Sequence, residues 1–165
     1  MNKNTIAEEV CIVRYADNNW IYKTVSSSKE LKEAISEFVG SSDYEVQYMD
    51  GALCKNATNN VLSLLEIAEE YEEDLETVGA LYNHYIDLET VKNVLDNGFI
   101  EISERNKLDA FIEYTENAGL LEEIPEHLVF YFDYEKYMKD LVFEGLDIIE
   151  VERPNALTNT YLFTH

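Results

Sequence analysis

The stretch from Glu113 to Glu144 constrains this chain most, because it interleaves apolar residues with nine acids and only two basic residues. Charged side chains rarely lie fully inside a protein, so only the apolar residues of the stretch are expected to be buried. Those residues are Leu120, Leu121, Ile124, Leu128, Phe132, Tyr137 and Leu141. The stretch is therefore predicted to fold as a small apolar seam with a negatively charged outer face.

The whole chain is acidic, with 34 Asp and Glu against 12 Lys and Arg and a net charge of -22 over 165 residues. A net charge of about 2–8 in magnitude is enough to keep a small domain in solution. Residues 1–61 carry only -3, whereas residues 62–103 carry -10 and residues 104–165 carry -9. Duplex DNA carries one charge per about 1.7 Å, so this total corresponds to roughly 37 Å of duplex. The charge disfavours binding to nucleic acid or to an anionic membrane and favours a basic protein partner.

The hydrophobic pattern predicts an α+β chain of three small domains. Alternating apolar residues predict strands over 9–15, 20–25 and 44–49. A helix between the last two begins at Ser27, with Glu30 in capping-box position, and ends at Gly40. The result is an N-terminal β-β-α-β unit.

The remainder is predicted to be mainly helical and acidic, and to close with a hairpin formed by 146–152 and 157–163. Asp87, Ser103 and Asp133 are expected to cap helices. The predicted domains are an N-terminal α/β domain, an acidic helical middle domain and an acidic C-terminal α/β domain, over 1–60, 61–103 and 104–165.

Acids cover one side of the helix predicted from Val61 to Glu73 and continue past its end. Four like-charge pairs at i,i+4 destabilise this region by about 1–2 kcal/mol in total. The alternative interpretation is that these acids form an ordinary solvated helix face. The pairs are Glu66–Glu70, Glu69–Glu73, Glu70–Asp74 and Glu72–Glu76.

The sequence holds no motif for phosphate binding, nucleophilic catalysis or a structural metal. His84, His127 and His165 are isolated, and no loop has the spacing of a calcium site. No enzyme activity, cofactor or metal is therefore expected. Cys11 and Cys54 are predicted to be free thiols in a reducing cytoplasm. Residues 1–10 lack the apolar region of a signal peptide, so none is expected. No apolar run approaches the ~20 residues of a membrane helix.

The segment from Ala118 to Leu141 resembles the C-terminal part of the ArdA antirestriction proteins. The residues that carry the resemblance are Gly119-Leu120, Ile124-Pro125, Leu128, Tyr131-Phe132-Asp133-Tyr134-Glu135, Tyr137 and Asp140-Leu141. The acidic middle with Leu62, Leu64 and Leu65 is similar to the second domain of that family. The N-terminal part, with Trp20, matches less well and is shorter than the family pattern.

The resemblance implies a small acidic protein of mobile genetic elements that mimics B-form DNA. Members form elongated homodimers of three small α/β domains per chain. They occupy the DNA-binding groove of type I restriction–modification enzymes and block cleavage, often modification too.

Under this hypothesis, carboxylates take the place of DNA phosphates. The residues expected to form the mimic surface are Glu66, Glu69, Glu70, Glu73, Asp74 and Glu76 in the middle, and Glu113, Glu116, Glu122, Glu123, Glu126, Asp133, Glu135 and Asp140 in the C-terminal part. The dimer contact is expected at Leu120, Leu121, Phe130 and Tyr134. The alternative is an acidic module that inhibits or chaperones another basic DNA-binding protein.

Overall fold

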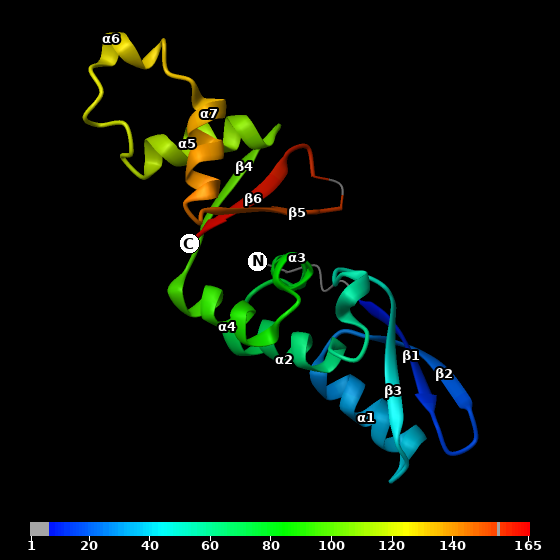
Figure 1. Cartoon of the computed structure of the whole chain (residues 1–165). Helices are drawn as coiled ribbons and strands as arrows, with labels where there is room; N and C mark the ends of the chain where they lie inside the picture. The colour runs from blue at the N-terminus through cyan, green and yellow to red at the C-terminus, as the bar shows by residue number, and fades with distance from the viewer. Residues whose placement is uncertain (1–6, 155) are drawn as a thin grey trace. The chain divides into compact units, whose positions relative to one another are not determined.

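The computed structural model describes residues 7–154 and 156–165, and over this part the chain is α+β (Figure 1). The described residues form seven α-helices and two antiparallel sheets of three strands each. The predicted fold class is therefore confirmed. The chain divides into two compact units, Met1–Leu95 (unit 1) and Asp96–His165 (unit 2). The predicted boundaries near 60 and 103 stay a prediction.

Unit 1 begins with the expected β-β-α-β unit. Strands β1 (Glu8–Arg14), β2 (Asn19–Val25) and β3 (Tyr44–Asp50) form a sheet in the order β2-β1-β3, and helix α1 (Ser28–Val39) lies between β2 and β3 in sequence. Because successive strand residues point to opposite faces, Val10 and Ile12 are fully buried on the side covered by α1.

The predicted ends of α1 are confirmed by its hydrogen bonds. The Ser27 hydroxyl oxygen accepts from the Glu30 backbone N–H at 3.2 Å, as in a capping box. The Glu30 carboxylate accepts from the N–H of Ser26 at 2.8 Å, one residue earlier than the standard pattern. Gly40 ends the helix with φ +62°, a backbone conformation that glycine adopts without strain.

The rest of unit 1 is helical, with the short 3₁₀ turn η1 (Lys55–Ala57) followed by α2 (Val61–Tyr71), α3 (Leu75–Tyr85) and α4 (Leu88–Asn97), whose last two residues belong to unit 2. The predicted break in the acidic run is present, because Glu72 ends α2 in the left-handed region with φ +53°. None of the helices in the described part of the chain is long and apolar enough to cross a membrane.

Unit 2 contains three helices, α5 (Lys107–Asn117), α6 (Glu126–Val129) and α7 (Tyr134–Phe143). It also contains three strands, β4 (Ile100–Glu104), β5 (Asp147–Val151) and β6 (Asn159–Thr164). The predicted closing hairpin is β5–β6, and β4 adds to the other edge of β6. The fully buried Phe111 lies in the core, where the rings of Tyr114 and Phe163 stack at 4.4 Å.

The predicted cap of α5 at Ser103 is wrong. Ser103 lies within β4, opposite Thr160 of β6, and the two hydroxyl oxygens are 3.2 Å apart. The helix instead begins after Asn106, whose side-chain oxygen accepts from the Asp109 N–H at 3.0 Å. Strand pairing in the sheet outcompetes the local capping signal at Ser103.

The apolar seam expected within Glu113–Glu144 forms only in part. Tyr134, Tyr137 and Leu141 pack against the core of unit 2, whereas Leu120 and Leu128 are exposed. The single turn of α6 contains no buried residue. This segment therefore leaves apolar side chains at the surface.

Glu8 is a fully buried carboxylate that fixes the loop after β3. Its oxygens accept from the backbone N–H groups of Ala52 at 2.9 Å and Leu53 at 3.2 Å. A Cβ at Gly51 would lie 2.5 Å from this carboxylate, so the loop needs glycine there. Burial raises the pKa of Glu8, although the two N–H groups act in the opposite direction.

We expect Glu8 to make the native state more stable as the pH falls through its raised native pKa toward 4.5. Its native pKa lies above its ordinary value of 4.5, so between these values the folded chain binds a proton that the unfolded chain does not. Urea unfolding at pH 7, 6 and 5 should show wild type gaining stability relative to Glu8→Gln, which cannot titrate. A difference between the two proteins that stays constant over this range would contradict the prediction.

Candidate functional site

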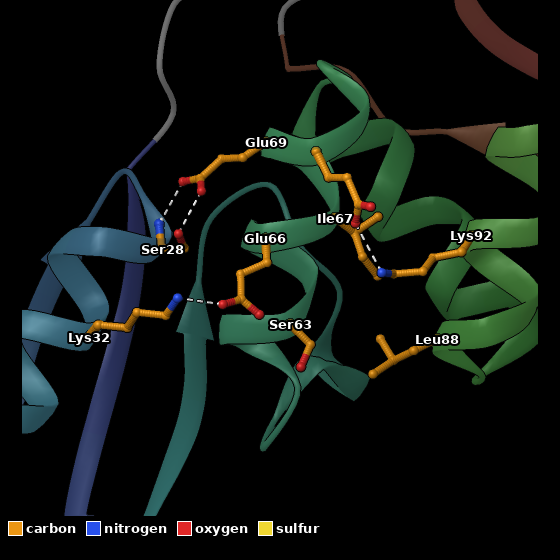
Figure 2. Close-up of a pocket in the computed structure, with 9 residues that line it drawn as sticks. Ser28, Lys32, Ser63, Glu66, Ile67, Glu69, Leu88 and Lys92 are labelled. Carbon is orange, nitrogen blue, oxygen red and sulfur yellow. Dashed lines mark hydrogen bonds and ion pairs between the residues drawn. The ribbon is translucent and has the colours of Figure 1, made fainter.

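Of the six acids predicted in the middle of the chain, three lie on α2, two lie in the turn after it and one lies in α3. The three on α2 bind partners within unit 1 (Figure 2). Glu66 forms an ion pair with Lys32 of α1 at 2.6 Å. Glu70 forms one with Lys92 of α4 at 3.0 Å. These lysines offset the repulsion expected between Glu66 and Glu70, and they join α2 to the two neighbouring helices.

Glu69 completes the N-terminus of α1. Its carboxylate accepts from the Ser28 backbone N–H at 2.7 Å and from the Ser28 hydroxyl at 2.6 Å. The first N–H groups of a helix have no partner within the helix, and a carboxylate there also interacts favourably with the helix dipole. Glu69 therefore has a structural role between α2 and α1.

Glu69→Ala is expected to destabilise unit 1 by about 1.5–3 kcal/mol, the range for a hydrogen bond to a charged group. Urea unfolding followed by the fluorescence of Trp20 measures the change. Glu37→Ala is the matched control, because Glu37 is exposed on α1 and its replacement should change stability by less than about 0.5 kcal/mol. Equal effects of the two substitutions would contradict the proposed role of Glu69.

These contacts surround a surface pocket of about 740 Å³ between α1, α2 and α4. Ser28, Lys32, Glu66, Glu69, Glu70 and Lys92 line it together with Ser63, Ile67 and Leu88. Three acids and two lysines face it, and the lysines are already bound to carboxylates. The pocket is thus a polar junction of helices.

The other three middle acids organise the turn from α2 to α3. Glu73 accepts from the Asp74 N–H at 3.0 Å. Asp74 caps α3 by accepting from the Thr77 N–H at 2.8 Å. Glu76 lies in the first turn of α3, where negative charge is favourable. All six middle acids therefore lie on α2, on α3 or in the turn between them, and their contact with a partner stays a prediction.

The C-terminal acids differ, because all eight are exposed. Asp133 caps α7 by accepting from the Lys136 N–H at 3.0 Å, as predicted. The other seven form no ion pair with Lys or Arg among the residues that the structure describes. We call these seven the unit 2 carboxylates: Glu113, Glu116, Glu122, Glu123, Glu126, Glu135 and Asp140.

The residues expected at a dimer contact separate into exposed and packed side chains. Phe130 is 89% exposed and Leu120 is also exposed, whereas Leu121 is half-buried and Tyr134 packs against the core of unit 2. Tyr131 is 80% exposed and its ring meets that of Phe130 edge to face at 5.5 Å. The exposed Leu120, Phe130 and Tyr131 lie in the turns before and after α6.

Sequence reasoning missed two further groups of exposed rings. Phe143 at the end of α7 is 93% exposed, and Trp20 and Tyr22 on β2 are exposed by more than half. The period-2 pattern places Trp20 and Tyr22 on one strand face, but it does not say whether another element covers that face.

The described residues contain no group of three or more His, Cys, Asp and Glu side chains arranged to hold a metal ion. Cys11 and Cys54 are free thiols, and burial raises the pKa of each. Comparisons of this chain with models of known protein families and with curated proteins find no match.

Proposed function

We propose that this protein is an antirestriction protein of the ArdA type, which mimics B-form DNA in the cytoplasm of a cell that carries a mobile genetic element. It occupies the DNA-binding groove of a type I restriction–modification enzyme and thereby blocks cleavage. The observation that supports this proposal is the set of seven exposed unit 2 carboxylates on a chain of net charge -22. Lys and Arg that neutralise DNA phosphates can bind such carboxylates instead.

A homodimer belongs to this proposal. Phe130 and Leu120 are exposed and offer apolar contact area, whereas Leu121 is half-buried and Tyr134 packs against the core of unit 2. Large exposed apolar patches mark interaction surfaces. Sedimentation should give about twice the monomer mass of 19.1 kDa. Phe130→Ser should shift the chain toward the monomer and Phe143→Ser should not; a wild-type monomer at all concentrations would contradict the homodimer.

The test of function is a titration into a purified type I restriction enzyme cleaving its own DNA site, at low and at moderate salt. We expect inhibition at near-stoichiometric amounts that salt or excess competing DNA relieves, because the contacts are electrostatic. Absence of inhibition across several type I enzymes, with a folded sample, would exclude antirestriction activity.

The alternative is an acidic module that inhibits or chaperones another basic DNA-binding protein. One observation favours it: Glu66, Glu69 and Glu70 bind Lys32, Ser28 and Lys92, which leaves less of the middle acid run available to a partner. Such a module would bind a basic partner without competing at the DNA groove of a type I enzyme. Competition by a cognate DNA duplex therefore distinguishes the two functions.

A further inference from the structure

The sheet of unit 1 has one face covered by α1, and on its other face several side chains of the described residues are exposed. The register aligns Trp20 with Val13 and Glu45, and Tyr22 with Cys11 and Gln47. Paired residues in an antiparallel sheet share a face, so these rows lie opposite the buried Val10 and Ile12. We call the solvent-accessible part of this surface the outer sheet face: the exposed Glu9, Tyr15, Trp20, Tyr22 and Asp50, and the half-buried Glu45.

Aromatic rings form one part of the outer sheet face. Trp20 is 60% exposed and Tyr22 is 67% exposed, and they are two residues apart on β2, roughly 7 Å along the strand. Tyr15 is also exposed, and its hydroxyl donates to the Glu45 carboxylate at 2.8 Å. The rings therefore stand beside a carboxylate and present their faces or edges to solvent.

Carboxylates form the other part of the outer sheet face, and two of them are paired across strands. Glu9 pairs with Asp50 at the end of the β1–β3 ladder, where the register shifts between Glu9 and Val10. Like charges paired across two strands are destabilising. Both residues are exposed, and neither forms an ion pair with Lys or Arg within the part of the chain that the structure describes. A cation placed between them would remove the repulsion.

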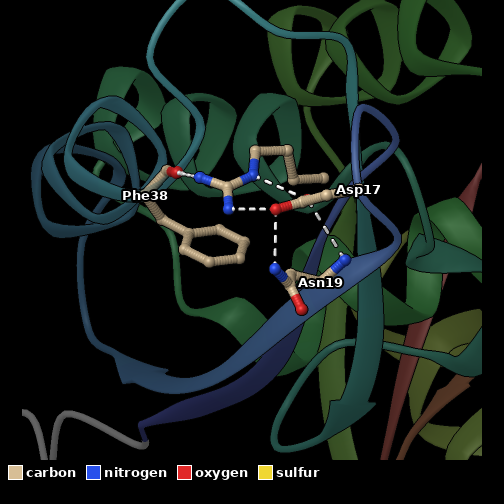
Figure 3. Close-up of polar contacts among 4 residues, drawn as sticks. Asp17, Asn19 and Phe38 are labelled. Atoms are coloured by element: carbon tan, nitrogen blue, oxygen red, sulfur yellow. Dashed lines mark hydrogen bonds and ion pairs between the residues drawn. The ribbon is translucent and has the colours of Figure 1, made fainter.

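The covered side of the same sheet shows how this chain binds a guanidinium group (Figure 3). Arg14 lies 4.7 Å from the ring centre of Phe38 and donates to both carboxylate oxygens of Asp17, at 2.9 and 2.6 Å. This pairing lowers the pKa of Asp17 to about 2. The ring of Phe38 and the carboxylate of Asp17 thus form a binding site for the Arg14 guanidinium within unit 1.

From this arrangement we propose that the outer sheet face binds an arginine-rich segment of a basic protein partner. Trp20 and Tyr22 stack on guanidinium groups, and Glu9, Asp50 and Glu45 pair with them. Thr24 is the residue of β2 opposite Glu9, and it lies four residues from Trp20, about 13 Å along the strand. An extended segment with arginines four residues apart spans the same distance. The inference rests on the proposed function in one respect, because it takes the partner to be a basic protein. The outer sheet face would then be a second contact surface, besides the unit 2 carboxylates.

The test uses the whole protein and two synthetic 14-residue peptides, one with arginine at every fourth position and one with lysine there, the rest Gly and Ser. Trp20 is the only tryptophan of the chain, so its emission reports this surface directly. Titrations at 150 mM salt screen long-range attraction. We expect the arginine peptide to change Trp20 emission and to bind about threefold more tightly than the lysine peptide, because guanidinium stacks better on rings.

Two variants assign the binding to the rings and to the carboxylates. Tyr22→Thr keeps a residue that favours strands and should weaken the arginine peptide about three- to fivefold. Asp50→Asn should weaken both peptides by similar factors. Phe143→Ser, which removes an exposed ring of unit 2, should change neither affinity, and calorimetry provides a readout independent of tryptophan emission.

Equal affinity for both peptides together with no effect of Tyr22→Thr would overturn the inference, since general charge attraction would then explain the binding. A Trp20 emission that changes on dilution without peptide would overturn it as well, because a second copy would then occupy this face. Inhibition of a type I enzyme by Tyr22→Thr is measured in parallel. Peptide binding that fails while inhibition persists rejects this inference alone, and inhibition that fails while peptide binding persists rejects the proposed function alone.

Discussion

Replacing the seven unit 2 carboxylates by their amides is expected to weaken binding to a type I restriction enzyme about 10³-fold. An exposed ion pair contributes about 0.2–1 kcal/mol, so seven together contribute roughly 4 kcal/mol, and 1.4 kcal/mol corresponds to a factor of ten. No single residue should dominate, so each single amide substitution should weaken binding only a few-fold. The measurement is the concentration that halves DNA cleavage, at low and at moderate salt.

A matched variant separates the surface from the net charge. Seven other exposed acids, when replaced by amides, give the same net charge of -15 instead of -22. If the unit 2 carboxylates form the mimic surface, this control should inhibit nearly as well as wild type and keep a steep salt dependence. Equal losses in both variants would contradict a localised surface. The control residues are Glu33, Glu37, Asp43, Glu89, Glu144, Glu150 and Glu152.

The middle acids call for a different experiment, since their substitution changes folding as well as charge. Glu66 and Glu70 join helices through Lys32 and Lys92, and Glu69 completes α1. A loss of inhibition after their replacement is informative only when the stability of unit 1 is measured in the same variant. The unit 2 carboxylates avoid this difficulty because they do not include Asp133, the C-terminal acid whose side chain caps α7.

Features that depend on a few neighbouring residues could be predicted from the sequence. Asp133 was expected to cap α7 and accepts from the Lys136 N–H. Asp87 was expected to cap α4 and accepts from the Thr90 N–H at 2.7 Å. Both interactions join residues three positions apart, so the signal lies within one turn of helix.

Features that depend on distant residues could not be predicted. Glu69 meets Ser28 across 41 positions, and β4 pairs with β6 across more than 50. Acid runs on α2 and in unit 2 look alike in sequence, yet their surroundings differ because Lys32 and Lys92 reach only the first. The exposure of Trp20 and Tyr22 likewise depends on what covers the sheet, which the alternation of β2 does not encode.

Phe111→Ala is expected to destabilise unit 2 by about 3–5 kcal/mol, the range for removing a large aromatic side chain from a core. Phe111 is fully buried and its ring lies 5.9 Å from that of Tyr137 on α7 and 6.2 Å from that of Tyr114. Hydrogen exchange should show the protection of β6 amides falling by at least 10²-fold. Phe143→Ala removes the same atoms from an exposed position and should change stability by less than about 0.5 kcal/mol.

The same variant links the core of unit 2 to its acidic surface. Tyr137 and Leu141 attach α7 to the core that Phe111 fills, and α5 and α7 carry four of the seven unit 2 carboxylates. Inhibition should therefore decline as unit 2 unfolds, at temperatures where the Trp20 emission and the β1 amides still report a folded unit 1. Loss of β1 protection together with β6 protection would contradict independent unfolding of the two units. Full inhibition by a chain whose unit 2 is unfolded would show that charge alone, without the arrangement that α5 and α7 impose, is sufficient.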